Sequence, residues 1–233
     1  MAHSSSRPQT LPPLRHLLVV GGGGRDQALA WALRRCSGVE AVWVSPGNGG
    51  TEELGDCRPL AIGEQDAAGL IKACQQQAVD LVVIGPEAPL AAGVADRLRD
   101  AGLAVFGPSA NGAQLEASKA WAKALMREAG IPTAGHWAVA SASEGLELLA
   151  KLQRPLVVKV DGLAAGKGVT VADNTEQTAS AIREAFAGRF GTAGERLVLE
   201  ERLQGPEVSV FALCDGERMV LPPPAQDLSL IHI

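Results

Sequence analysis

Short apolar runs that are followed by glycine or proline recur through the first half of the chain, and they restrict its fold more than any other feature. Four of them stand out, at residues 17–20, 41–44, 81–84 and 103–106. Because segments of helical character separate them, they predict parallel strands joined by crossover helices in an α/β domain. Ligands bind such an open sheet beyond the carboxyl ends of its strands. The loops that follow the four runs are therefore expected to line one crevice.

The first of these loops consists of consecutive glycines, Gly21 to Gly24. Apolar residues follow at the spacing of one helix face: Leu29, Ala32, Leu33 and Cys36. A helix that packs this face on the sheet points its N-terminus at the crevice, where backbone N–H groups and the helix dipole favour an anion. The dinucleotide-binding pattern fails, because its third glycine would fall on Asp26 or Gln27. A phosphate site for a small molecule is favoured over a dinucleotide site and over a purely structural turn.

Beyond about residue 110 the pattern changes to mixed helices and strands, which places a domain boundary near 110–118. Helices are predicted after Ser118, Ser141 and Asn174, each of which is a favourable N-cap residue. The residues expected to face inward are Trp121, Ala122, Leu125 and Met126 in the first helix, Leu146, Leu149 and Ala150 in the second, and Ala181, Ile182, Ala185 and Phe186 in the third. Further strands are predicted at residues 197–200, 208–213 and 218–221, the last two joined by a turn at 215–216.

The segment 157–171 sets a glycine-rich loop with a lysine between two β-branched runs, which predicts a β-hairpin. The loop is not a Walker A loop, because only three residues separate Gly162 from Gly166 and because Gly168 replaces the hydroxyl residue. Its glycines let backbone N–H groups approach a phosphate, and Lys167 adds charge. A lid over a triphosphate and an ordinary surface hairpin both remain open on this loop alone.

Composition restricts the class of protein. With 46% hydrophobic residues, 20% charged residues and a net charge of −5, the chain is typical of a soluble globular protein, without the basic excess of a nucleic-acid partner. Its apolar runs are of strand length, so no membrane span is expected. Residues 1–14 lack the apolar core of a signal peptide and predict a disordered leader. Scattered cysteines and histidines predict reduced thiols, a cytoplasmic location and no metal site: Cys36, Cys57, Cys74, Cys214, His3, His16, His136 and His232.

Seven sequence blocks follow one another between about His16 and Asp227: GGGGRD, SPGNGGT, VVIGPEAPLAAGV, FGPSANGAQLEASKAWAK, GIPTA, VVKVDGLAAGKGV and LVLEERLQGPEVSV. In these blocks the chain resembles the glycinamide ribonucleotide synthetases, ligases of purine biosynthesis in the ATP-grasp superfamily. The resemblance implies a Rossmann-like parallel-sheet domain at residues 15–114 that binds phosphoribosylamine. It also implies an incomplete α+β ATP-grasp domain at residues 115–227.

The activity implied by the resemblance is the joining of glycine to 5-phosphoribosylamine by a monomer, through an acyl phosphate, with ATP and Mg²⁺ or Mn²⁺. Lys159 and Lys167 are implied as catalytic residues. The residues implied at the nucleotide are Lys119, Lys159, Gly166, Lys167, Gly168, Glu200, Glu201, Leu203 and Glu207. Those implied at the other substrates are Gly22, Gly23, Gly24, Arg25, Gly47, Asn48, Gly49, Glu87, Ala88, Pro89 and Asp227.

Two stretches depart from the family pattern. Asp26 and Gln27 stand where the family commonly has Glu and His. After Asp227 the chain reads LSLIHI, which is not family-like and which a widely used sequencing adaptor encodes. We therefore expect a truncated chain with a non-native tail at 228–233, rather than a natural short isoform. Such a chain would lack the metal-binding carboxylates and would be inactive by itself.

Three other functions remain as alternatives. Another ATP-grasp carboxylate–amine ligase or a carboxylase subunit would share the hairpin but not the loops at 45–51 and 85–93. A nucleotide-binding module without catalysis and an NAD oxidoreductase are the alternatives from other classes. Binding of ATP, NAD or a ribose 5-phosphate mimic would separate them.

Overall fold

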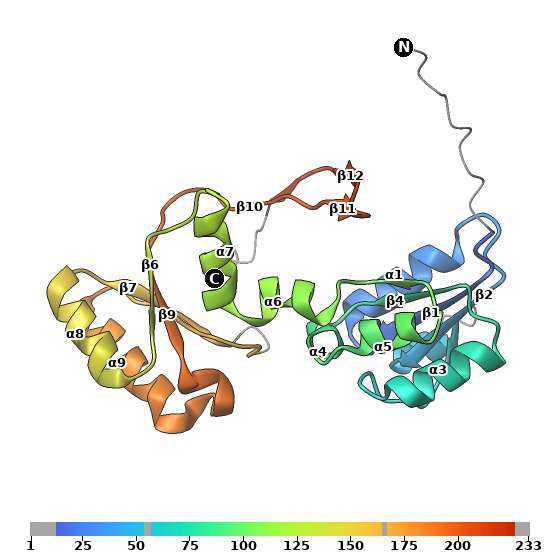
Figure 1. The fold of residues 1–233 in the computed structure, drawn as a ribbon, viewed down its shortest axis with the longest axis horizontal. Helices are drawn as coiled ribbons and strands as arrows, with labels where there is room; N and C mark the ends of the chain where they lie inside the picture. The colour runs from blue at the N-terminus through green and yellow to red at the C-terminus, as the bar shows by residue number, and fades with distance from the viewer. Residues whose placement is uncertain (1–12, 54–56, 165–166, 227–233) are drawn as a thin grey trace, which may run out of the picture.

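The computed structural model describes residues 13–53, 57–164 and 167–226. Figure 1 shows two sheet-containing halves joined through helices α6 (Ala110–Ala117) and α7 (Lys119–Glu128). The predicted leader at 1–14 falls mostly outside the described residues, and the predicted tail at 228–233 lies wholly outside them. No described helix has both the length and the apolar character that crossing a membrane requires.

The first half contains a parallel sheet of five strands in the order β3-β2-β1-β4-β5. The strands are β1 (His16–Gly21), β2 (Ala41–Pro46), β3 (Cys57–Pro59), β4 (Leu81–Ile84) and β5 (Val105–Phe106). The prediction of parallel strands is confirmed, although β5 is shorter than the predicted run and β3 was not predicted. Strand β3 has only three residues, one of them proline, so no alternating pattern marks it in the sequence.

Helices cover both faces of this sheet. They are α1 (Gly24–Arg34), α2 (Gly49–Glu53), α3 (Ala67–Gln76), α4 (Glu87–Ala91) and α5 (Val94–Asp100). One core packs Leu18 and Val20 of β1 against Leu70 of α3 and Leu98 of α5. A second core packs Leu17 and Val19 against Ala30 of α1. Strand β1 is therefore buried on both faces, as its uninterrupted apolar run requires.

The predicted inward face of α1 is wrong. Leu29 and Cys36 are exposed and so is Ala32, whereas Asp26 and Ala30 are the buried residues of this helix. Leu33 is the one predicted residue that packs on the core. The helix is turned because the short carboxylate of Asp26, rather than an apolar side chain, fills the space next to the end of the sheet.

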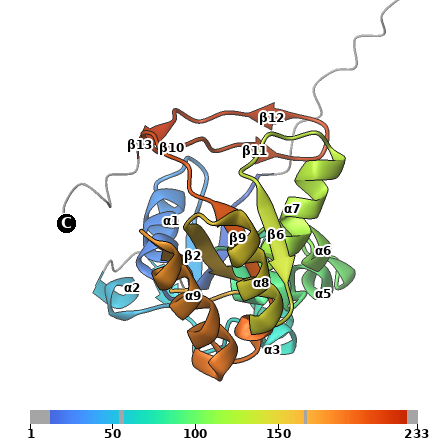
Figure 2. The same cartoon turned by 90° about the vertical axis from the view of Figure 1, so that its left-hand side faces the viewer.

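The second half contains an antiparallel sheet in the order β6-β9-β7-β8. Its strands are β6 (His136–Val139), β7 (Leu156–Val160), β8 (Val169–Val171) and β9 (Leu197–Glu201). Helices α8 (Ala142–Leu152) and α9 (Thr175–Glu184) cover one face, as Figure 2 shows, and the short helical turns η1 (Ala185–Arg189) and η2 (Gly191–Glu195) follow α9. The predicted hairpin is confirmed by the pairing of β7 with β8.

All three predicted N-caps of this half are present. Ser118 accepts a hydrogen bond from the amide of Trp121, Ser141 from that of Glu144, and Asn174 from that of Gln177. The predicted inward residues of α8, α9 and η1 pack on the core, apart from Ala150, which is exposed. In α7 only Ala122 is buried, and Trp121, Leu125 and Met126 are half-buried. Local capping chemistry thus fixes where these helices begin.

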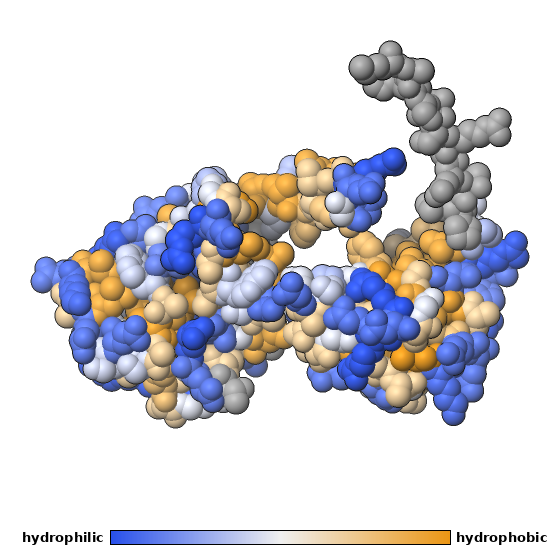
Figure 3. Space-filling view, in the orientation of Figure 1, coloured by the Kyte–Doolittle hydropathy of each residue, from blue (hydrophilic) through white to orange (hydrophobic). Residues whose placement is uncertain are grey.

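The last part of the described chain is a ribbon of two short antiparallel pairs. Strands β10 (Val208–Ser209) and β13 (Ala225–Gln226) form one pair, and β11 (Leu213–Cys214) and β12 (Met219–Val220) form the other. The single strand predicted at 208–213 is therefore interrupted. Seven apolar side chains of this ribbon are more than half exposed: Val208, Val210, Phe211, Leu213, Met219, Val220 and Leu221. Figure 3 shows a largely hydrophobic segment that projects from the surface where Figure 1 draws this ribbon.

Candidate functional site

A cleft of about 580 Å³ lies between the two halves of the chain. Its lining comes from the loops after β1 and β4 on one side and from α6, α7 and the β7–β8 hairpin on the other. The lining residues are Arg25, Pro86, Glu87, Ala88, Glu116, Lys119, Gly162, Leu163, Ala164, Gly168 and Val169. Five of these, Arg25, Glu87, Ala88, Lys119 and Gly168, are predicted site residues. The fold therefore brings residues from both predicted domains to one place.

Arg25 and Glu87 meet at the centre of the first sheet, because β1 and β4 are neighbours and the loops after them adjoin. Arg25 Nη2 donates to Gly85 O at 2.8 Å and to Glu87 Oε1 at 3.1 Å. The backbone N–H of Glu87 itself and then the guanidinium of Arg25 hold the pKa of the Glu87 carboxyl below its usual range. Glu87 is therefore an anionic acceptor at the cleft, beside a side chain that can bind an anion.

Asn48 ties together the loops after β1 and β2. Its Nδ2 donates to Gly22 O at 3.0 Å, and its Oδ1 accepts from the amide of Gly50 at 2.9 Å. Thr51 Oγ1 donates to Gln27 Oε1 at 2.8 Å and accepts from the amide of Asn48. The predicted residues Gly22, Asn48 and Gly47 thus form one connected loop pair, in which Asn48 is engaged through both ends of its amide.

Asp26 is a buried carboxylate at the start of α1, with 4% of its surface exposed. Its Oδ2 accepts from the amide of Gly23 at 2.9 Å, while Oδ1 has no partner in the described part of the chain. Glycine is required beside it, since a Cβ on Gly85 would lie 1.8 Å from Oδ1 and a Cβ on Gly21 would lie 2.2 Å from its Cγ. Asp26 is one of the two residues that depart from the family pattern. Its buried carboxylate restricts the neighbouring positions 21 and 85 to glycine.

The N-terminus of α7 meets the base of the hairpin. Asp161 Oδ1 accepts from the Ser118 hydroxyl and from the amide of Ala120, each at 3.0 Å. Lys119 Nζ donates to Gly162 O at 3.0 Å. Lys119 is thus at the cleft and attached to the glycine-rich hairpin loop.

Lys167 is exposed and does not line this cleft; it borders a separate hollow with Ala164, Arg189 and Phe190. Gly166 and Asp227 lie outside the described residues. Gly168 is buried against Val160, with a Cβ position 2.4 Å from Val160 Cγ2, so no larger residue fits there.

Glu200 is the centre of a charged cluster on the sheet face that carries α7. Its carboxylate is 6% exposed, and its Oε2 lies 3.0 Å from Lys159 Nζ and 3.0 Å from Lys123 Nζ. Lys123 also donates to Thr133 Oγ1 at 2.7 Å. Sequence reasoning found Glu200 and Lys159 but missed Lys123, although its position four residues after Lys119 puts both lysines on one face of the helix.

Three predicted nucleotide residues do not line the cleft: Glu201, Leu203 and Glu207. Glu201 accepts from the amide of Gly135 at 3.2 Å and pairs with Arg154. Leu203 is 72% exposed, and Glu207 is also exposed. The contacts of Glu201 tie the end of β9 to Gly135 and Arg154.

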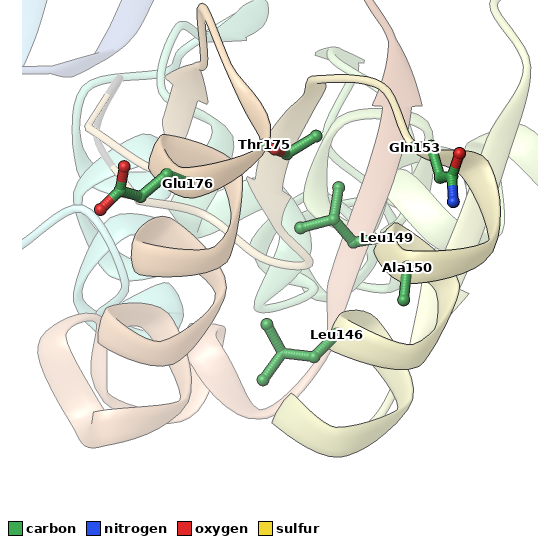
Figure 4. Close-up of a pocket in the computed structure, with 6 residues that line it drawn as sticks. All are labelled: Leu146, Leu149, Ala150, Gln153, Thr175 and Glu176. Carbon is green, nitrogen blue, oxygen red and sulfur yellow. The ribbon is translucent and has the colours of Figure 1, made fainter.

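Another hollow, of about 530 Å³, lies between α8 and α9 and is drawn in Figure 4. Leu146, Leu149 and Ala150 reach it from α8 and Thr175 and Glu176 from the start of α9. It contains none of the predicted site residues. Within residues 13–53, 57–164 and 167–226, no group of three or more His, Cys, Asp or Glu could hold a metal ion.

Comparison with known families matches almost the whole chain. Residues 15–116 match the model of the phosphoribosylglycinamide synthetase N domain. Residues 117–232 match the model of the ATP-grasp (A) domain of the same family.

Individual relatives agree with these matches. The chain is 53% identical over 211 residues to a phosphoribosylamine–glycine ligase of Nostoc, with 91% of this chain and 50% of the relative covered. It is 45% identical over 212 residues to the ligase of Escherichia coli, with 91% and 49% covered. The chain thus spans about half the length of the curated relatives it matches.

Solved structures show the same fold. The crystal structure of a Thermotoga maritima phosphoribosylamine–glycine ligase superimposes with a TM-score of 0.76 at 30% identity, covering 90% of this chain and 49% of the other. A biotin carboxylase from Campylobacter jejuni superimposes with a TM-score of 0.71 at 16% identity, covering 89% and 50%. The second likeness supports the fold alone.

Proposed function

Since the chain belongs to the phosphoribosylglycinamide synthetase family, we propose that it contributes to an enzyme that joins glycine to 5-phosphoribosylamine. ATP would be consumed and glycinamide ribonucleotide, ADP and phosphate would be formed. The observation that carries the proposal is the cleft in which Arg25 and Glu87 of one half lie opposite Lys119 and the hairpin of the other. A reaction between a bound nucleotide and a second bound substrate needs such a meeting of two sites.

The phosphoribosylamine site is proposed in the first half. The start of α1 beside Gly22 and Gly24 suits a phosphate, because a helix N-terminus offers unpaired donors and a favourable dipole, while the Gly23 N–H is held by Asp26. Glu87 can accept hydrogen bonds from ribose hydroxyls, and Arg25 can hold an anionic group. Gly47–Gly49 and Glu87–Pro89 complete this proposed site.

The nucleotide site is proposed in the second half, around Lys119, Lys159 and Glu200. Lys119 and Lys159 would hold phosphates, and the Glu200 carboxylate would accept a hydrogen bond from the amino group of adenine. Lys167 and Gly168 belong to the hairpin that would close over the phosphates. For Glu201, Leu203 and Glu207, which lie away from the cleft, contacts to the nucleotide would be made through the backbone or after a rearrangement of the ribbon.

The proposed chemistry has two steps. The glycine carboxylate attacks the γ-phosphorus of ATP, which gives glycyl phosphate and ADP. The amine of phosphoribosylamine then attacks the carbonyl carbon, loses a proton and expels inorganic phosphate. Binding both partners in one cleft reduces the entropic cost of the second step.

Magnesium or manganese would neutralise charge on the ATP phosphates in such a reaction. The described residues supply no carboxylate cluster that could hold such a metal. A cytoplasmic location is also proposed, because the substrates are small soluble metabolites, and a monomeric state is proposed for the full-length enzyme.

A chimera tests the ligase proposal. Residues 15–226 of this chain would be followed by the corresponding second half of the Nostoc relative, which is 53% identical over the matched part. We expect formation of glycinamide ribonucleotide from glycine, phosphoribosylamine and MgATP. A folded chimera that binds ATP but not ribose 5-phosphate and forms no product would contradict the proposal and favour a different ATP-grasp ligase.

A further inference from the structure

Two lysines share one oxygen of the buried Glu200 carboxylate, and they differ in exposure. Lys123 is 11% exposed and Lys159 is 28% exposed, measured on their side chains, and each Nζ lies 3.0 Å from Glu200 Oε2. Lys123 lies on α7 and is fixed further by Thr133 Oγ1 at 2.7 Å. Lys159 lies on β7, two residues before the hairpin loop. Lys123 is therefore held by two acceptors, and Lys159 is close in sequence to the hairpin loop.

The charges of the cluster do not balance. Two ammonium groups face one carboxylate, which leaves one positive charge over within the trio. A buried carboxylate needs a charged or hydrogen-bonding partner, because an unpaired one is costly to desolvate. One lysine satisfies that need. The other is available to an incoming anion without leaving Glu200 unpaired.

We propose that Lys123 is a positioning residue for nucleotide binding, which holds Glu200 in place while Lys159 moves to the nucleotide phosphates. The inference rests on the proposed function, in which the nucleotide lies between Glu200 and the hairpin. Lys159 is the lysine that moves, because it is more exposed and, among the described residues, its ammonium donates to Glu200 alone, whereas Lys123 has a second acceptor in Thr133.

A positioning role of Lys123 predicts different effects on ligands with and without phosphates, which a merely structural role does not. Without Lys123, Lys159 is the remaining lysine beside Glu200. If Lys159 then moves to the phosphates of a ligand, the buried Glu200 carboxylate loses its ion-pair partner. Adenosine carries no phosphate and leaves Lys159 on Glu200. Loss of Lys123 should therefore weaken binding of ADP and leave binding of adenosine nearly unchanged.

The test measures the dissociation constants of ADP and of adenosine for the 233-residue chain and three variants by titration calorimetry or ligand-observed NMR. The variants are Lys123→Met, Lys123→Arg, and Lys151→Met as the matched control on the solvent face of α8. In Lys123→Met we expect the ratio of the adenosine to the ADP dissociation constant to fall about tenfold or more. Lys123→Arg restores a charge near Glu200 and should recover most of the ratio, while Lys151→Met should not change it.

Different outcomes contradict different claims. If the wild-type chain binds ADP and the ratio in Lys123→Met equals that of the wild type, or if both ligands weaken equally, Lys123 has no positioning role and the proposed nucleotide site stands. If the wild-type chain shows no ADP binding at millimolar ligand, the nucleotide site under the proposed function fails, and the role of Lys123 fails with it. Thermal unfolding of each variant verifies that it is folded.

Discussion

At the scale of single residues, the site depends on charges that are paired in the protein and available to ligands. Lys159 is the most informative of them, since its ammonium pairs with the buried Glu200 carboxylate. In the ligase-length chimera, Lys159→Ala should weaken ATP binding by about tenfold or more and leave ribose 5-phosphate binding unchanged, because the two ligands contact different halves. The fold should persist, as Glu200 keeps Lys123. Equal loss of both ligands in a folded variant would argue against this placement of ATP.

Glu87 offers a test at the other substrate. Glu87→Gln keeps the shape of the side chain and removes its charge, so the Michaelis constant for phosphoribosylamine should rise about fivefold to tenfold while that for ATP changes little. Because the pKa of Glu87 is lowered, its carboxylate keeps its charge to a lower pH than an ordinary Glu does. The ratio of the wild-type to the variant affinity for ribose 5-phosphate should thus stay constant from pH 8 to pH 5. It should approach one only below pH 5, where Glu87 becomes protonated. An unchanged constant for phosphoribosylamine would remove Glu87 from the site.

At the residue level, the family resemblance named Arg25, Glu87 and Lys119, and the fold brings all three to the lining of one cleft. Their roles toward the substrates stay predictions. Lys123 was missed because its importance comes from Glu200, which is far away in the chain and reaches it only through the sheet. Neighbours along a strand point to opposite faces, so the side chain of Glu201 pairs with Arg154 while that of Glu200 faces the lysines, and a nucleotide contact of Glu201 stays a prediction.

At the scale of elements, the start of α1 is set by a contact that sequence periodicity does not contain. The apolar spacing predicted an inward face through Leu29, whereas the structure turns Asp26 and Ala30 inward. The carboxylate needs two glycines opposite it, and those glycines lie in loops that come together only in the folded sheet. By contrast, the caps at Ser118, Ser141 and Asn174 depend on bonds within three residues, so they were predictable.

Gly85 tests this packing. Gly85→Ala would place a Cβ 1.8 Å from Asp26 Oδ1, so the carboxylate must move and release the amide of Gly23. We expect a loss of about 2 kcal/mol in the free energy of unfolding, measured with denaturant. Gly63→Ala is the matched control, since a Cβ there meets nothing within 4 Å. In an Asp26→Ala background, Gly85→Ala should lower the free energy of unfolding much less than it does in the wild type. Equal losses in the two backgrounds would contradict the clash.

At the scale of the whole molecule, the two halves differ in how completely they are covered. The first half has helices on both faces of its sheet and cores on both sides of β1. The ribbon from β10 to β13 instead exposes apolar side chains, among them Phe211 at 57% and Val210 at 66%. The sequence predicted strands there from their β-branched residues, but periodicity within a run does not reveal whether anything packs on it.

This difference leads to a prediction about folding and association. Exposed apolar strands with free edges tend to associate, so the 233-residue chain should form concentration-dependent oligomers. Replacing Val210, Phe211 and Leu221 by Ser, Thr and Lys should reduce that association, as measured by sedimentation velocity. A monomeric wild type at high concentration would show that the ribbon folds back on the molecule in solution.

Limited proteolysis tests whether the first half of the chain is stable without the second. The region around α6 lies between two separately packed cores, and the first of these cores needs no contribution from the second sheet. We expect a resistant fragment that ends near residues 110–118, and we expect this fragment to unfold cooperatively when it is produced alone. Its ribose 5-phosphate affinity should be close to that of the whole chain, because Arg25 and Glu87 are both retained and still bonded to each other. A fragment that is unfolded, or that ends inside the first sheet, would mean that the second half is needed to stabilise the first.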